Sequence, residues 1–115
     1  MPLETRKYLY DIQQAIELIE GFCSGKKFPD YQQNAMLRSA VERQLEIVGE
    51  AVSRLAQLNP ALAAKLTEYR RIIAFRNILI HAYATIDDRI VWGVIEGKLP
   101  QLRREVTKLL LADTD

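Results

Sequence analysis

Cysteine and histidine are nearly absent from this sequence, which has one of each, Cys23 and His81, among 115 residues. A single thiol excludes a disulfide framework within the chain, and one histidine with one cysteine cannot form a His/Cys zinc site. Cys23 lies on the apolar side of a helical pattern, so we interpret it as a small buried residue rather than a reactive thiol. We expect no bound metal ion and no cofactor.

An excess of charge of one sign is also missing, as are long apolar runs. Lysine and arginine number 16 and aspartate and glutamate 15, which gives a net charge of +1. This balance excludes a polycation that coats nucleic acid, although it permits a local basic patch. No stretch has the ~18–20 uncharged residues of a membrane span, and the first residues lack the apolar core of a signal peptide. We therefore expect a cytoplasmic protein without membrane contact.

Glycine and proline are few, with five and four residues, and they leave long stretches in which apolar residues recur every three or four positions. That spacing is typical of amphipathic helices, and an apolar share of 49% is ample for a packed core. No stretch alternates apolar and polar residues for long enough to indicate a strand. With 115 residues the chain has the size of a single domain, 1–115.

Turn and capping residues divide this periodic pattern into helices. Gly25 ends the first helix, Pro29 and Asp30 begin the second, and Asn59 with Pro60 restarts the chain after it. Pro100, with Gly97 close before it, should kink or split the last helix. The predicted helices span about residues 4–23, 30–58, 60–66, 67–84 and 87–112. The sequence therefore predicts an all-α, up-and-down bundle of four to five helices.

Most catalytic motifs are missing, including a phosphate-binding glycine loop, His-Glu-x-x-His and Gly-x-Ser-x-Gly. Glu42, Glu46 and Glu50 are spaced by four residues and share one helix face. A di-metal carboxylate bundle would also need Glu-x-x-His partners, which the sequence lacks. We interpret the three glutamates as a solvated or interface-facing stripe.

One segment, residues 70–83, concentrates the candidates for chemistry. It holds the single histidine, His81, and three arginines: Arg70, Arg71 and Arg76. Between positions 65 and 76 four positive residues accompany one negative residue, which gives a local charge of +3. Asn77 and His81 lie one turn apart, about 40° around a helix, and the long side chain of Arg76 can bend toward the same side.

This combination of residues suits phosphodiester chemistry. Guanidinium groups bind phosphate oxygens in pairs and stabilise charge on a pentavalent phosphorus. An imidazole with a pKa near ~6.5 can take the proton of a ribose 2′-hydroxyl or return one to a leaving 5′-oxygen. Such cleavage uses both a base and an acid, and the chain has one histidine, so a symmetric homodimer would supply the second.

The same residues also allow a structural interpretation. A lone histidine on a mainly apolar helix is commonly a core or helix-end residue, which would describe His81 equally well. Arg76 could pair with Glu46 or Glu50 across the bundle, and Tyr83 could pack with its hydroxyl at the surface. The residues alone leave both interpretations open.

The segment Arg76-Asn77-Ile78-Leu79-Ile80-His81-Ala82-Tyr83 resembles the Arg-x4-His-x-Tyr motif of HEPN domains in the HepT-like (DUF86) family. The stretch from Glu46 to Ala51 is similar to that family's Glu-x-x-Gly-x-Ala, and residues 86–100 are similar to its C-terminal helix. The resemblance covers nearly the whole chain in the right order.

The resemblance implies a helical bundle that dimerises, with the Arg and His of both protomers lining a shared cleft. It implies a metal-independent endoribonuclease with Arg76 and His81 as catalytic residues and Asn77 in support. We expect Arg70 and Arg71 to contact RNA phosphates. It further implies the toxin half of a toxin–antitoxin pair, neutralised when a minimal nucleotidyltransferase antitoxin transfers AMP onto Tyr83.

A second function stays open at the level of sequence. The chain could be a non-catalytic helical partner that binds nucleotide or a nucleotidyltransferase and does not cut RNA. A purely structural dimer explains the apolar stripes but not the arginines clustered around the single histidine. The intact motif favours the enzyme over both.

Overall fold

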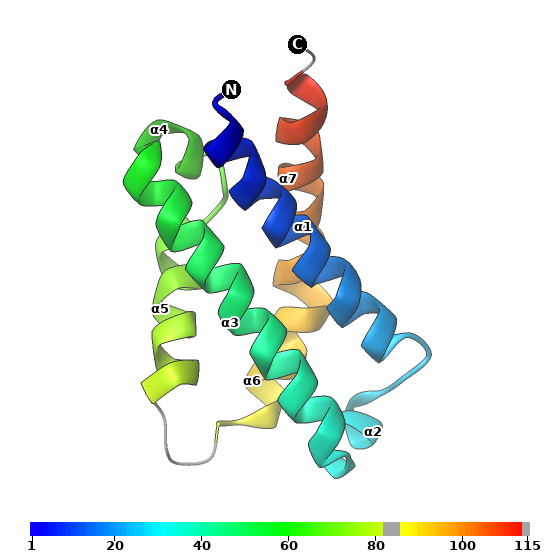
Figure 1. The fold of residues 1–115 in the computed structure, drawn as a ribbon. Coiled ribbons are helices and arrows are strands. Elements are labelled where there is room, and N and C mark those ends of the chain that lie inside the picture. The colour runs from blue at the N-terminus through cyan, green and yellow to red at the C-terminus, as the bar shows by residue number, and fades with distance from the viewer. Residues whose placement is uncertain (82–85, 114–115) are drawn as a thin grey trace.

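The computed structural model describes residues 1–81 and 86–113, and the regular secondary structure of this part of the chain is entirely helical. Three long helices alternate in direction: α1 (Leu3–Cys23), α3 (Ala35–Leu58) and α5 (Tyr69–His81) (Figure 1). A fourth column returns through α6 (Asp88–Gly93), η1 (Val94–Lys98) and α7 (Leu99–Ala112). The short helices α2 (Phe28–Gln33) and α4 (Pro60–Ala63) lie where the chain turns back. The all-α, up-and-down bundle predicted from the sequence is confirmed.

The core lies between α1, α3 and the fourth column. α3 packs against α1 and α5, while α7 packs against α1. Residues of α1 and α3 that step by three or four positions are fully or almost fully buried, among them Leu9, Ile12, Ile16, Ile19, Val41, Leu45, Val48, Val52 and Leu55. Burying a side chain of this size contributes about 1.5–3 kcal/mol, so this shared seam is the main stabilising contact of the bundle.

Tyr31 of α2 closes one end of the bundle. It is fully buried, and its ring centroid lies 5.5 Å from that of Trp92 on α6. α2 begins at Phe28, two residues before the predicted start, and the Asp30 carboxylate caps it by accepting a hydrogen bond of 2.8 Å from the Lys27 N–H. This short helix ties the start of α3 to the start of the fourth column.

The predicted continuous helix over residues 30–58 is wrong, because the chain breaks at Asn34. This residue has an extended backbone (φ −117°, ψ 99°), and its side chain accepts a hydrogen bond of 3.0 Å from the Leu37 N–H. Asparagine stabilises a helix N-terminus in this way, since it satisfies a backbone donor that has no partner within the helix. The spacing of apolar residues continues across Asn34, so the sequence pattern does not reveal that the helix is interrupted there.

α5 begins two residues later than predicted, at Tyr69. Glu68 adopts the left-handed region (φ 56°), which interrupts any helix running into α5. Thr67 is held in place because its N–H and its hydroxyl both donate to the Glu105 carboxylate of α7. The described helix ends at His81, three residues before the predicted end at 84, and residues 82–84 lie outside the described part.

The last helix is interrupted as predicted, and the interruption is the π-helical turn η1. The Leu99 N–H bonds to the carbonyl of Val94, five residues earlier. Pro100 has no N–H to bond the carbonyl four residues before it, so the wider turn accommodates the missing donor. Among the described residues, no helix is long and apolar enough to cross a membrane.

Candidate functional site

α5 lies close to α3 where Arg76 packs over Gly49. A Cβ built on Gly49 would lie 2.7 Å from Cγ of Arg76 and would overlap its Cβ. Real side chains do not approach so closely, so only glycine allows this contact. Gly49 therefore fixes both the distance between the helices and the point on α5 that faces α3.

Two polar groups hold the guanidinium of Arg76. One terminal nitrogen lies 2.5 Å from a carboxylate oxygen of Glu50, and the other donates a 3.0 Å hydrogen bond to Oδ1 of Asn77. The second oxygen of Glu50 accepts a hydrogen bond of 3.0 Å from Nε of Arg54. Each terminal nitrogen of Arg76 keeps one further N–H, so the group retains two donors for a phosphate.

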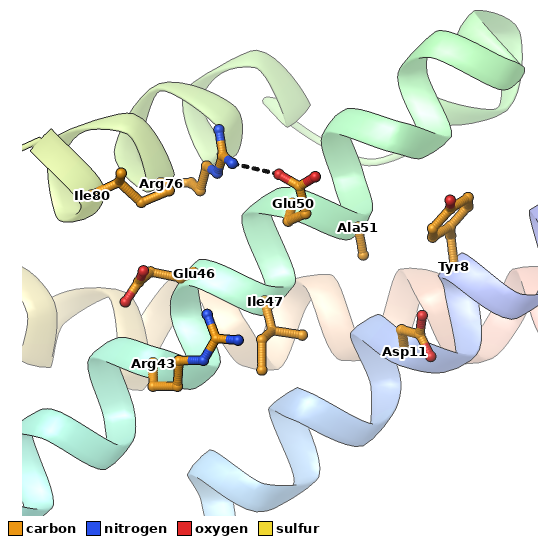
Figure 2. Close-up of a pocket in the computed structure, with 9 residues that line it drawn as sticks. All are labelled: Tyr8, Asp11, Arg43, Glu46, Ile47, Glu50, Ala51, Arg76 and Ile80. Carbon is orange, nitrogen blue, oxygen red and sulfur yellow. Dashed lines mark ion pairs between the residues drawn. The ribbon is translucent and has the colours of Figure 1, made fainter.

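The same ion pair lies at a groove of about 310 Å³ between α1, α3 and α5 (Figure 2). Carboxylates, guanidiniums, apolar side chains and one tyrosine line it: Tyr8, Asp11, Arg43, Glu46, Ile47, Glu50, Ala51, Arg76 and Ile80. Within the described residues, no three His, Cys, Asp or Glu side chains are arranged to hold a metal ion. The groove offers hydrogen-bond donors and acceptors beside apolar walls.

His81 is the last described residue of α5, is exposed and does not line this groove. Asn77 is also exposed; it accepts a hydrogen bond from Arg76 and lies one turn before His81. Arg70 lies within about 20° of both Asn77 and His81 around the helix. α5 therefore presents an exposed polar stripe, and the side chain of Arg76 reaches it at Asn77.

Arg71 does not join that stripe. Its side chain is 85% exposed, forms an ion pair of 2.9 Å with Glu68, and borders a different, apolar groove between α5 and η1. Arg70 instead packs its guanidinium on the Tyr69 ring, 5.6 Å from the centroid. The two arginines predicted to contact phosphate therefore face different sides of α5.

Tyr83 lies outside the described residues, so its predicted role stays a prediction. Two other questions that the sequence left open, one about Arg76 and one about the glutamates of α3, have answers in the structure. Arg76 does pair across the bundle, with Glu50 rather than Glu46. The stripe of Glu42, Glu46 and Glu50 is half-buried between helices.

Sequence reasoning missed the direct role of Gly49 and the contribution of α1 to the groove. The available signal was the Glu-x-x-Gly-x-Ala stretch, which pointed to α3 without indicating which residue it contacts. A glycine within a long helical pattern costs about 1 kcal/mol relative to alanine, and such a cost usually has a packing reason.

The bundle, with Arg-x4-His on one helix facing a second helix that carries Glu-x-x-Gly, defines a protein of the HEPN type. The sequence identifies the family within this class, because residues 12–109 match the family described as "Ribonuclease HepT-like". The chain belongs to this family.

Curated relatives match over nearly their whole length. The chain is 36% identical to "Probable ribonuclease HepT" of Thermococcus cleftensis over 109 residues, which cover 95% of this chain and 98% of the relative. It is 33% identical to "Putative RNase TTE0752" of Caldanaerobacter subterraneus, covering 91% and 93%. It is 31% identical to a similarly named RNase of Methanocaldococcus jannaschii, covering 90% and 94%. No solved structure matches the chain significantly.

Proposed function

We propose that this protein is an endoribonuclease that cleaves RNA without a metal ion, with Arg76 and His81 as its catalytic residues. The observation that carries the proposal is the setting of Arg76. Gly49, Glu50 and Asn77 hold its guanidinium next to an exposed stripe that ends at the single histidine. Membership of the HepT-like family and the ribonuclease names of the relatives support the same activity.

The reaction is an internal transfer at phosphorus. His81 removes the proton of a ribose 2′-hydroxyl, and that oxygen attacks the adjacent phosphorus as the bond to the 5′-oxygen breaks. The leaving 5′-oxygen takes a proton from a protonated imidazole, so the products are a 2′,3′-cyclic phosphate and a 5′-hydroxyl. Arg76 donates to the phosphoryl oxygens, whose negative charge increases in the transition state.

A second copy of the chain supplies the second imidazole in this proposal. His81 is exposed, and so is the apolar side chain of Ile78 beside it, at 56% of its surface. A two-fold axis near this end of α5 would bring two copies of Asn77 and His81 to one cleft, because a symmetric interface pairs each patch with itself.

The direct test is cleavage of RNA by the purified protein in EDTA, compared with Arg76→Ala and His81→Ala. We expect each variant to lose roughly 10²–10⁴-fold in rate, the usual contribution of a general acid–base or of a donor to a charged transition state. Arg104→Ala, an exposed arginine of α7, serves as the control and should cleave like the parent.

The same experiment distinguishes the rival function, a partner protein that binds nucleotide without cutting. The ion pair between Arg76 and Glu50 favours that alternative, since a partly exposed pair between two helices can also be purely structural. Tight RNA or nucleotidyltransferase binding, no cleavage by the parent and no effect of His81→Ala would establish the rival instead.

Regulation by a minimal nucleotidyltransferase antitoxin completes the proposal, with Tyr83 as the residue that receives AMP and this chain as the toxin. The added phosphate would lie two residues from His81 and would compete with the substrate for Arg76. Tyr83→Phe is expected to abolish AMP transfer, measured as the absence of the mass increase. A Tyr83→Phe protein that its partner still modifies and inactivates would contradict the assignment.

A further inference from the structure

The charges around the groove decide which part of an RNA can enter it. Three carboxylates, from Asp11, Glu46 and Glu50, accompany two guanidiniums, from Arg43 and Arg76. The formal charge of the lining is −1, so the part of the groove away from Arg76 does not attract a phosphate. The RNA group that fits this lining is an uncharged base that carries hydrogen-bond donors for the carboxylates.

Most of these charged groups already have partners. Asp11 accepts a hydrogen bond of 2.8 Å from Lys7, and Glu50 is shared by Arg76 and Arg54. The two remaining groups, Arg43 and Glu46, have no ion pair or side-chain hydrogen bond within residues 1–81 and 86–113. They are three residues apart on α3, so they are neighbours on one helix face. The groove thus keeps one free acceptor beside one free donor.

Only one RNA base presents the complementary edge. A carboxylate accepts two parallel N–H bonds, and guanine alone carries two adjacent donors, N1–H and the N2 amino group, with the O6 acceptor next to them. Adenine and cytosine each place a ring acceptor beside their amino group, and uracil has a single N–H between two carbonyls. Glu46 would accept from N1 and N2 while Arg43 donates to O6.

The remaining walls suit a flat ring. Ile47, Ala51 and Ile80 are apolar, and the half-buried Tyr8 adds an aromatic face. Single-stranded RNA is commonly recognised in this way, with an unstacked base against such a wall and its Watson–Crick edge hydrogen-bonded. A volume of about 310 Å³ is at the small end of ligand pockets, which run from about 300 to 1,000 Å³.

We propose that this groove is a guanine-binding subsite, in which Glu46 and Arg43 select the nucleotide next to the phosphate that Arg76 contacts. The inference rests on the proposed ribonuclease function, because it places an RNA strand across α5. Arg76 lines the groove and also borders the exposed stripe, so a base in the groove and a phosphate at Arg76 can belong to one nucleotide.

Oligonucleotides test the proposal at the level of single atoms. Uridine oligonucleotides would carry one guanosine, one inosine or one adenosine, and inosine differs from guanosine by the missing N2 amino group. We expect cleavage next to guanosine to exceed cleavage next to adenosine by roughly tenfold or more, with inosine in between. Glu46→Gln should lower the guanosine rate toward that of adenosine, because an amide cannot accept both N–H groups. Glu17→Gln, an exposed glutamate of α1, should keep the preference.

Binding of non-cleavable 2′-O-methyl versions, measured by fluorescence anisotropy, separates the two proposals. Guanosine-selective binding that Glu46→Gln removes, without cleavage by the parent, would support the subsite and overturn the ribonuclease. Cleavage at equal rates next to all bases, or a guanosine preference unchanged in Glu46→Gln, would overturn the subsite and leave the ribonuclease standing.

Discussion

At the scale of single residues, the approach of α5 to α3 depends on the side chain that Gly49 lacks. The glycine leaves space for the Cβ and Cγ of Arg76, and this contact puts the guanidinium within reach of Glu50. The carboxylate and the amide of Asn77 then restrict a long, flexible side chain to one orientation. A guanidinium fixed in this way loses less entropy when it binds a phosphate than a freely rotating one.

Replacing Gly49 with alanine tests this contact. The new Cβ must displace Arg76, and overpacking of this kind typically costs about 1–3 kcal/mol. We expect Gly49→Ala to lower the free energy of unfolding by that amount in urea titrations. Its RNA cleavage should fall as well, because the guanidinium moves from its partners.

Gly21→Ala is the matched control, since a Cβ at Gly21 on α1 meets nothing within 4 Å. Alanine is the better helix former, so this change should raise stability by about 0.5–1 kcal/mol. The same chemical substitution then has opposite signs at the two sites. An equal loss of stability in both variants would show that Gly49 is not special.

The position of Asn77 and His81 one turn apart was predictable from sequence, because it follows from helix geometry alone. The partner of Arg76 was not, because Glu46 and Glu50 share a face of α3. The choice between them depends on where α5 crosses, and only the packing at Gly49 decides that point.

At the scale of elements, the helix ends that depend on a capping residue next to them in the sequence were predictable. Asn59 caps α4, as expected, through a 3.1 Å hydrogen bond from the Leu62 N–H. The break at Asn34 was missed because apolar residues keep their spacing on both sides of it. Met36 is one of these regularly spaced apolar residues, and yet it is 80% exposed. Periodicity therefore predicts which face is apolar but not whether the helix is continuous.

The electrostatic interaction between Glu42 of α3 and Asp88 of α6 makes stability depend on pH. Burial raises the pKa of Glu42, and the nearby carboxylate of Asp88 raises it further, against the opposing effect of Arg38. A carboxyl whose pKa is raised on folding stabilises the fold when protonated, and this contribution is lost as pH rises through that pKa.

We therefore expect Glu42→Gln to be more stable than the parent at pH 7. The advantage should shrink as the pH falls toward about 4, where the parent glutamate becomes protonated as well. Urea titrations at a series of pH values measure both curves, with the exposed Glu17→Gln as a control that should follow the parent. A constant difference at all pH values would mean that titration of Glu42 is not its cause.

At the scale of the whole molecule, the proposed enzyme needs two chains. Ile78 lies about 60° from His81 around α5 and is 56% exposed, so a second copy can cover it while the fold of one copy stays unchanged.

Ile78→Asp is accordingly expected to yield a folded monomer that cleaves RNA poorly. In a symmetric interface the new aspartate would be buried opposite the same aspartate of the second chain, and the two negative charges would repel each other. Sedimentation equilibrium measures the mass, and circular dichroism checks the helical content. Leu111→Asp is the control, since this residue is 71% exposed near the end of α7, at the opposite end of the bundle (Figure 1). A monomeric parent with full activity would refute the dimeric cleft.

The contact between Gly49 and Arg76 also determines how much the connection that leads into α5 can change in length. Because Gly49 accepts only one side of α5, the rotation of that helix is set where the two helices cross and not by the segment that leads into it. Insertions or deletions between Ala63 and Tyr69 should then leave the same side chains facing the groove, and the cost of a longer loop grows only slowly with its length. The length of this connection can therefore change while the same arginine stays in place, provided that the buried Leu66 and the bonded Thr67 are kept.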